Sequence, residues 1–210
     1  MKDAKTFWDR SAGRYARSPI KDEASYQRKL ELTRECFSSD CQVLEFGCGT
    51  GGTALAHAPW VGSYIASDIS TSMLDIGRQR AAEEGVENLR FAEGDLLELS
   101  FADSSFDVVL GLNVLHLIEP LQETLECVHR LLKPGGAFVS STALVAEISW
   151  VWRCAIPLMQ WIGLAPFVQR LDRAGLEQRL SAAGFVVEQC WQPPGGALFV
   201  VARKPAQQPG

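Results

Sequence analysis

The stretch Val43-Leu44-Glu45-Phe46-Gly47-Cys48-Gly49-Thr50-Gly51-Gly52 decides the fold of this chain. A short apolar run ends in a cluster of glycines, and a helix-compatible segment begins at Thr53. This order predicts a buried strand, a tight turn and the start of a helix. Glycines suit such a turn because it needs unusual backbone dihedrals and because a ligand must approach the main chain closely.

Two ligand-binding patterns fit the turn. Gly47, Gly49 and Gly52 match the dinucleotide pattern G-x-G-x-x-G, while Glu45 with Gly47, Gly49 and Gly51 matches a second pattern, E-x-G-x-G-x-G. A glycine-rich turn alone does not separate these two patterns, so the rest of the chain has to decide.

The composition is typical of one globular domain covering residues 1–210, with 47% hydrophobic and 21% charged residues. A formal net charge of -5 argues against nonspecific binding of nucleic acid, which needs clustered Lys and Arg. No signal peptide is visible after Met1. The six cysteines include no C-x-x-C pair, which predicts reduced thiols in a cytoplasmic protein without structural zinc.

Residues 1 to about 40 are predicted to form two helices, broken near Ser18-Pro19. The first helix is amphipathic and rich in aromatic residues, among them Trp8 and Tyr15. It either packs on the edge of the sheet or covers a ligand as a lid, with Tyr15 facing the site. Lids and packing helices look alike in sequence, so both interpretations stay open.

Beyond the glycine turn, strand and helix patterns alternate. Pro134-Gly135-Gly136 is expected to end the helix that Pro120 opens, and Pro193-Pro194-Gly195-Gly196 separates two last strands that must therefore be antiparallel. The fold class is α/β: a Rossmann-like, doubly wound, mostly parallel seven-stranded sheet with a C-terminal antiparallel hairpin. Strands are expected at residues 43–46, 64–68, 88–92, 106–111, 137–142, 185–188 and 198–201, and helices at 70–85, 120–133 and 172–183.

Two carboxylates follow predicted strands at the edge where such sheets bind ligands. Asp68 lies roughly 20 residues beyond the first glycine, where a carboxylate reaches the hydroxyls of a bound ribose. Asp95 follows the next strand. Each aspartate is alternatively a cap of a helix or turn, but their position and order favour contact with a ligand.

Taken together, the motifs resemble those of the class I S-adenosylmethionine-dependent methyltransferases, over essentially the whole chain. The nearest branch looks like the small bacterial enzymes related to the quinone-biosynthesis C-methyltransferases. The resemblance rests on these segments: 45–51, Asp68 with Met73-Leu74, Gly94-Asp95, Ser105-Phe106-Asp107, Leu115-His116 and 131–136. A nicotinamide-dependent dehydrogenase does not account for Asp95, the Lys-Pro-Gly-Gly break or the closing hairpin, and no residues remain for a second half-domain.

The resemblance implies the cofactor S-adenosyl-L-methionine, its product S-adenosyl-L-homocysteine, and a set of cofactor-binding residues. The glycine turn would cradle the methionine portion, Asp68 would bind both ribose hydroxyls, and Asp95 would accept from the adenine amino group. The implied cofactor-binding residues are Tyr15, Glu45, Gly47, Cys48, Gly49, Gly51, Asp68, Ile69, Met73, Asp95, Leu96, Gly111 and Leu112.

His116 is the candidate catalytic residue, because it is the only histidine near the expected site and could act as a general base. It is alternatively a packing or capping residue. His57 and His129 fall on helices away from the site. No cluster of His and acidic residues has ligand spacing, so no metal is expected.

The segment 143–170 is an apolar insert, with Trp150, Trp152 and Trp161 distributed over two helical faces. A helix that is apolar on two sides must touch something besides the core. The first interpretation is a wall of the acceptor pocket, with Trp8, Tyr15, Trp150 and Trp152 as lining residues. The second is contact of 143–168 with another copy of the chain or a membrane surface; no integral membrane span is expected.

The sequence thus predicts a methyltransferase that moves a methyl group from S-adenosylmethionine to a small, largely apolar acceptor by in-line displacement. The alternative is a noncatalytic module that binds S-adenosylmethionine or S-adenosylhomocysteine.

Overall fold

The computed structural model describes residues 2–146 and 167–206. As predicted, the N-terminal region forms two helices, α1 (Lys2–Arg17) and α2 (Glu23–Arg34). The remaining elements in chain order are β1 (Gln42–Phe46), α3 (Gly52–His57), η1 (Ala58–Trp60), β2 (Ser63–Asp68), α4 (Thr71–Glu84), β3 (Leu89–Glu93), β4 (Phe106–Leu112), η2 (Leu115–Leu117), α5 (Leu121–Leu131), β5 (Leu132–Thr142), α7 (Arg173–Ala182), β6 (Val186–Trp191) and β7 (Leu198–Arg203).

The strands form one seven-stranded sheet in the order β3-β2-β1-β4-β5-β7-β6. β1 to β5 are parallel, whereas β7 runs antiparallel to both β5 and β6. This confirms the predicted Rossmann-like sheet with a C-terminal antiparallel hairpin. The order reverses between β1 and β4, and such a switch point is where sheets of this class bind ligands.

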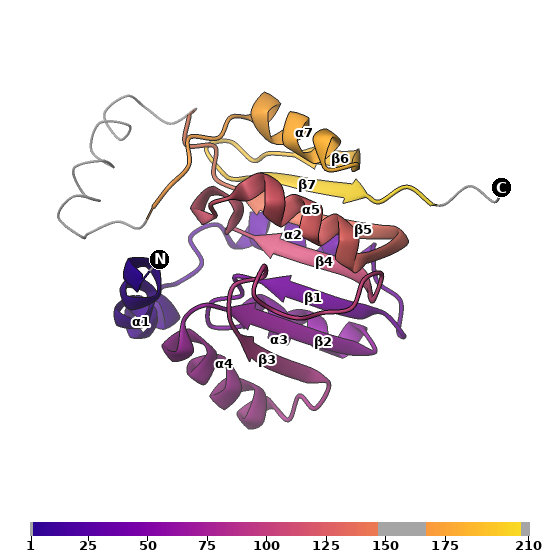
Figure 1. Cartoon of the computed structure of the whole chain (residues 1–210). Coiled ribbons are helices and arrows are strands. Elements are labelled where there is room, and N and C mark those ends of the chain that lie inside the picture. The colour runs from indigo at the N-terminus through magenta and orange to yellow at the C-terminus, as the bar shows by residue number, and fades with distance from the viewer. Residues whose placement is uncertain (1, 147–166, 207–210) are drawn as a thin grey trace.

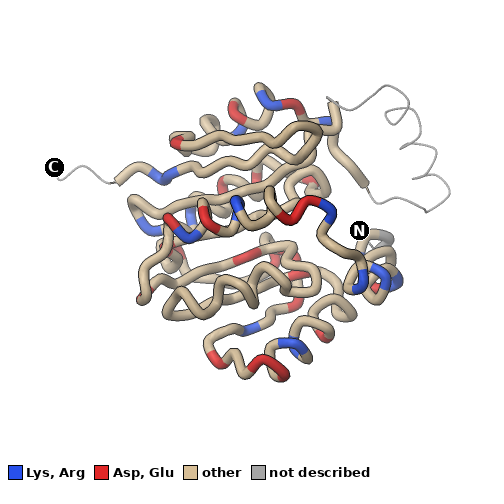
Figure 2. Tube along the Cα trace, turned by 180° about the vertical axis from the view of Figure 1, so that it is seen from behind, with Lys and Arg blue, Asp and Glu red and all other residues tan. Residues whose placement is uncertain are grey.

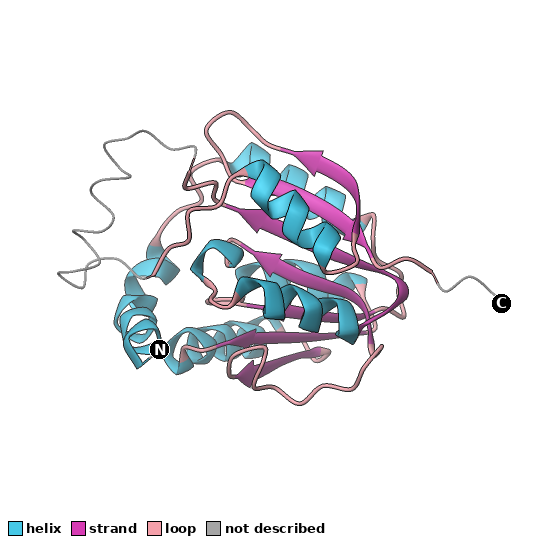
Figure 3. Ribbon diagram, turned by 45° about the horizontal axis from the view of Figure 1, so that its top comes forward, coloured by secondary structure: helices cyan, strands magenta, loops and turns pink. Residues whose placement is uncertain are grey.

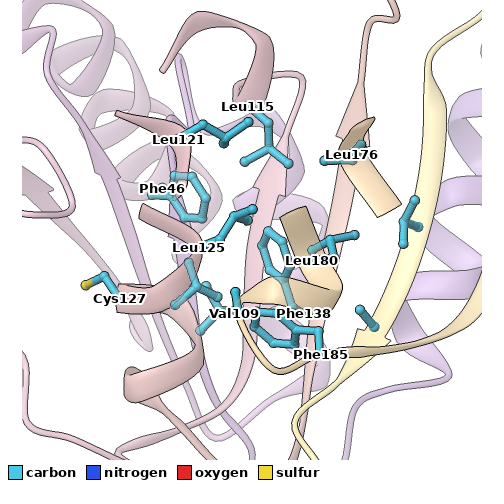
Figure 4. Close-up of a cluster of buried hydrophobic side chains, with 14 of the residues drawn as sticks. Phe46, Val109, Leu115, Leu121, Leu125, Cys127, Phe138, Leu176, Leu180 and Phe185 are labelled. Carbon is cyan, nitrogen blue, oxygen red and sulfur yellow. The ribbon is translucent and has the colours of Figure 1, made fainter. Parts of the chain in front are cut away.

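Helices cover both faces of the sheet (Figure 3). Alternate residues of the central strands belong to the two buried clusters on opposite faces. On one face, Val43 and Val108 pack in a buried cluster with Leu32 of α2 and Leu55 of α3. On the other face, Phe46 and Phe138 stack with their ring centroids 6.3 Å apart. Around this pair lie Leu125 of α5 and Leu176 and Leu180 of α7, as Figure 4 shows. The sheet is therefore covered on both sides, as parallel strands require.

The turns follow the expected local chemistry. The Ser70 hydroxyl caps α4 by accepting from Met73 N, and Gly85 ends that helix in the left-handed conformation. Asp172 caps α7 through Gly175 N.

One predicted boundary is wrong. α5 ends at Leu131, before the Pro-Gly-Gly break, and β5 begins at Leu132. Phe106 pairs with Leu132 and Val108 with Ala137, so residues 133–136 form an irregular insertion within the strand. Hydrogen bonds between the main chain of this insertion and Lys204 hold it to the chain after β7, a long-range pairing that local sequence does not reveal.

α1 lies beyond the edge of the sheet toward which the parallel strands point (Figure 1). Acidic and basic residues are interspersed along the helices, while the strands are mostly uncharged (Figure 2). Among the residues described, none of the helices has the length and apolar character needed to cross a bilayer.

Candidate functional site

A cavity of about 980 Å³ opens at the carboxyl edge of the sheet. Its walls come from the turns after β1, β2, β3 and β4, from the inner side of α1, and from Ala143, Phe167 and Val168. This volume is at the upper end of the range for small-molecule pockets, which run to about 1,000 Å³.

The glycine turn after β1 forms part of the cavity floor. Gly47 and Gly49 line the cavity and have φ of +65° and +56°. A Cβ on Gly47 would lie 2.3 Å from the Val114 side chain, so this glycine permits the close approach of the segment after β4. A Cβ on Gly49 would point toward the Tyr15 ring at 3.5 Å and would fill the space between the turn and α1.

Asp68, at the end of β2, holds the turn through its carboxylate. Its Oδ2 accepts from Gly49 N at 2.8 Å, and its Oδ1 accepts from Ser70 N at 2.9 Å. Burial raises the pKa of this carboxyl, and the two backbone donors oppose that rise. Each oxygen retains acceptor capacity toward the cavity, which Asp68 lines together with Ile69 and Met73. The carboxylate is therefore fixed in place at the cavity wall.

Asp95, after β3, lies in the same cavity wall as the buried Leu96. Asp95 Oδ1 accepts from Leu97 N at 2.9 Å, which fixes the side chain within its own turn. The capping interpretation of Asp95 and the ligand-facing one are thus compatible, because a carboxylate that caps a turn with one oxygen still presents the other.

Four of the predicted cofactor-binding residues lie behind the cavity surface. The Glu45 carboxylate is buried and accepts from the Tyr64 hydroxyl at 2.8 Å. Burial is the main cause that raises the pKa of Glu45 to about 7. Cys48 and Gly51 sit within the turn, and Gly111 has the Phe46 ring where a Cβ would stand, at 2.6 Å. These four residues support the site from behind its lining.

α1 covers one side of the cavity with Trp8 and Tyr15. Lys5 and Asp9, whose roles the sequence reading missed, dock the helix on the turn after β2. Lys5 Nζ donates to Ile69 O at 3.0 Å, and Asp9 Oδ1 accepts from the Ser70 hydroxyl at 2.7 Å. The i, i+4 spacing of Lys5 and Asp9 was the available signal, but it also fits a solvated ion pair.

The far end of α1 is also tied down. Arg80 of α4 donates from Nη2 to Ala16 O at 3.1 Å and from Nη1 to Thr50 Oγ1 at 3.4 Å. α1 is therefore attached at both ends to the elements that carry the glycine turn and Asp68.

The segment after β4 forms the opposite wall, with Leu112, Asn113, Val114 and His116. His116 Nδ1 is buried and has no hydrogen-bond partner within 2–146 and 167–206. Burial lowers the pKa of His116 to about 4, so the imidazole is neutral at pH 7. His57 and His129 lie away from this wall, as expected from the sequence.

The predicted lining tryptophans of the insert, Trp150 and Trp152, lie outside the described residues. The flanking residues Ala143 and Phe167 do line the cavity. Within the described ranges, no three His, Cys, Asp or Glu side chains gather as a metal site would require.

Comparison with known proteins finds similarity to methyltransferases. Residues 43–136 match the family described as "Methyltransferase domain". An uncharacterized methyltransferase, YcgJ of Bacillus subtilis, is 36% identical over 107 residues, which is 51% of this chain and 42% of that protein. The demethylmenaquinone methyltransferase of Symbiobacterium thermophilum is 32% identical over 130 residues, 57% of this chain and 52% of that protein. The chain thus matches about half the length of these curated relatives.

Solved structures agree in fold. The crystal structure of Bacillus subtilis YcgJ has a TM-score of 0.72 at 20% identity, covering 86% of this chain and 100% of that one. An S-adenosylmethionine-dependent methyltransferase of Mesorhizobium loti has a TM-score of 0.71 at 20% identity, covering 87% and 99%. Residues 43–136 therefore match a methyltransferase domain, and the fold of the chain is that of solved S-adenosylmethionine-dependent methyltransferases.

Proposed function

We propose that this protein transfers the methyl group of S-adenosylmethionine to a small, largely apolar acceptor. The observation that carries the proposal is a single cavity, large enough for donor and acceptor together, that combines the glycine turn, Asp68 and Asp95. S-adenosylmethionine, when bound, supplies a methyl carbon on a positively charged sulfur. The protein's main task is then to bring an acceptor in line with that carbon and to exclude water.

The residues present fit this cofactor. Gly49 leaves open the space that a side chain would fill, which suits close approach of a ligand to the backbone. The fixed Asp68 carboxylate suits a ribose diol, and Asp95 with Leu96 suits the edge of an adenine ring, with Ile69 and Met73 against its faces. Leu112 at the end of β4 would meet the amino end of the donor. Glu45 supports the turn from behind, through Tyr64.

The acceptor half of the cavity lies beyond the glycine turn, toward β5. Val114, Leu117, Ile118 and Phe167 give it an apolar lining, which suits an acceptor with little charge. The relatives include a demethylmenaquinone methyltransferase, and an apolar ring of that kind is compatible with such a wall. His116 is the candidate base, because it lines the cavity and its imidazole is neutral at pH 7. The lid role of α1 follows from Trp8 and Tyr15, which close the cavity from the other side.

The experiment is turnover. Purified protein is incubated with S-adenosylmethionine carrying a labelled methyl group and with apolar small-molecule extracts, and both S-adenosylhomocysteine and labelled product are quantified by mass spectrometry. We expect both to form in equal amounts and to fall together in Asp68→Ala. Tight binding of S-adenosylhomocysteine without any labelled product would instead support the noncatalytic module.

A further inference from the structure

Three polar side chains, from α2, β5 and the segment after β4, form a hydrogen-bonded chain that ends at the cavity. Lys29 Nζ donates to Ser141 Oγ at 2.9 Å, and Ser141 Oγ donates to Asn113 Oδ1 at 3.1 Å. Ser141 is buried, and Asn113 lines the cavity. Methyl transfer at the cofactor site described above does not require these three hydrogen-bonded side chains.

The directions of the two hydrogen bonds follow from the chemistry of the groups. A lysine ammonium only donates, so Ser141 Oγ must accept from Lys29 and has its single proton left for Asn113. Burial lowers the pKa of Lys29, and Asp22 opposes that effect. Asn113 Oδ1 therefore accepts the hydrogen bond from Ser141, and the Nδ2 donors of Asn113 point the other way.

The backbone fixes Asn113 in this orientation. Its φ is +57°, in the left-handed region that asparagine tolerates better than most residues, and its N–H donates to Ser141 O at 2.7 Å. Asn113 and Ser141 are thus joined by two hydrogen bonds, one through the main chain and one through the side chains. Asn113 Nδ2 has no partner among the residues described.

The position of Asn113 assigns this residue to the binding of the methyl acceptor rather than of the methyl donor. In the strand order β3-β2-β1-β4-β5, the donor residues Asp95, Asp68 and Gly49 follow β3, β2 and β1. Asn113 and His116 follow β4, and Ala143 follows the neighbouring strand β5 in the same wall. A ligand that extends from Asp95 to the glycine turn leaves the Asn113 side of the cavity for the second substrate.

The Lys29 charge behind Asn113 favours an oxygen anion at Asn113, whereas the carboxylates that line the cavity oppose one. Lys29 has no salt-bridge partner in the part of the chain that the structure describes, and its charge stands directly behind the Ser141–Asn113 pair. The charged residues that line the cavity are Lys5, Asp68, Glu93, Asp95, Glu98 and Glu119, and of these Lys5 is paired with Glu93. His116 is neutral at pH 7 and adds no charge.

We propose that Asn113 Nδ2 binds the oxygen of a phenolic acceptor as its oxyanion, with Ser141 and Lys29 as positioning residues. This inference rests on the proposed methyltransferase function and names the acceptor class for it. The phenol proton leaves to solvent on binding, and the Lys29 charge stabilises the phenolate. Aromatic side chains at Trp8 and Phe167 give the ring of such an acceptor its apolar contacts.

The test uses protein saturated with S-adenosylhomocysteine and the probe 4-nitro-1-naphthol, whose naphtholate absorbs visible light. A spectroscopic pH titration gives the pKa of the bound probe, with 1-nitronaphthalene as the analogue that lacks the hydroxyl. We expect the naphtholate to bind about tenfold more tightly than the neutral naphthol, which lowers the pKa of the bound probe by about one. The naphtholate should also bind more tightly than 1-nitronaphthalene.

Variants at Lys29, Ser141 and Asn113 show how much each residue contributes to the pKa change of the bound probe. Lys29→Met and Ser141→Ala should abolish most of the pKa change, and Asn113→Asp should reverse its sign while keeping the shape of the side chain. Ser140→Ala, which removes a hydroxyl from the opposite face of β5, is the matched control and should behave as the wild type. Binding of S-adenosylhomocysteine is measured first in every variant, to confirm the fold.

The outcomes are distinct. A wild type that fails to bind S-adenosylhomocysteine contradicts the proposed function itself. If S-adenosylhomocysteine binds but the naphtholate does not, the phenolic class of acceptor is wrong. The same follows if the pKa of the bound probe is equal in the wild type and in Lys29→Met. If Asn113→Asp weakens S-adenosylhomocysteine instead of the probe, Asn113 serves the donor and the inference is overturned.

Discussion

The carboxylate of Asp68 accepts the amide proton of Gly49 at 2.8 Å, which joins the end of β2 to the glycine turn after β1. Asp68 therefore fixes the turn and also faces the cavity. The position of an aspartate at the end of a strand does not show from sequence that it does both. Removing it should affect both the shape of the turn and the binding of a ribose.

For Asp68→Ala, we expect the affinity for S-adenosylhomocysteine to fall by about 1–3 kcal/mol, because ribose hydroxyls lose a charged acceptor. The free energy of unfolding should also fall, since Gly49 N and Ser70 N lose their partner. Calorimetry and urea unfolding measure the two effects. Asp75→Ala, on the exposed side of α4, is the control. A variant that loses stability but keeps full affinity would make Asp68 a purely structural cap.

The docking of α1 should control how fast a ligand leaves. Asp9→Ala removes the acceptor for the Ser70 hydroxyl and Ser72 N, so α1 should detach more often. The loss of about 1 kcal/mol corresponds to about a fivefold faster dissociation of S-adenosylhomocysteine. Hydrogen exchange in α1 should rise in parallel, whereas Arg10→Ala on the exposed side should change neither. Unchanged dissociation with faster exchange would mean that α1 does not act as a lid.

The raised pKa of Glu45 should make the stability of the fold depend on pH. Its folded pKa of about 7 lies above the ordinary 4.5, so the unfolded chain ionises first as pH rises. Stability is therefore lost between about pH 4.5 and 7, by up to about 3 kcal/mol. Glu45→Gln keeps an acceptor for Tyr64 and should stabilise the protein at pH 8 but not at pH 4.5, by urea unfolding. An equal change at both pH values would refute the assignment to ionisation.

The lowered pKa of His57 should make stability depend on pH in the opposite direction, with a loss as pH falls. It is fully buried against Phe37, both ring nitrogens lack partners among the residues described, and burial lowers its pKa to about 3. As pH falls below 6.5 the unfolded chain binds a proton that the folded one does not, which costs about 2 kcal/mol of stability by pH 5. His57→Leu should remove this loss, measured against its own stability at pH 7.5. A variant that is as acid-sensitive as the wild type would assign the effect to other groups.

The sequence predicted well the features that depend on neighbours along the chain. Ser70 and Gly85 bound α4 as expected because a cap and a left-handed glycine act within one helical turn. The Pro134-Gly135-Gly136 boundary was wrong because its conformation depends on pairing with Lys204, far away in sequence. Propensity acts locally, whereas this pairing is a tertiary contact.

The same limit applies to the site. Gly47, Gly49, Asp68 and Asp95 could be predicted as candidates because each follows a strand at the ligand-binding edge, and all four line the cavity. Lys5 and Tyr64 were missed, since their partners Ile69 and Glu45 come from other elements of the fold. Asn113 was missed for the same reason, because only the sheet order brings it beside Ser141. The contacts of all these residues with a cofactor stay a prediction.

Titration of the purified chain with S-adenosylmethionine and S-adenosylhomocysteine in a calorimeter tests whether the cavity binds this cofactor. We expect one site per chain with micromolar affinity, about -8 kcal/mol, and a raised melting temperature with either ligand. Saturating concentrations of both ligands that give no heat of binding and no change in melting temperature would contradict it.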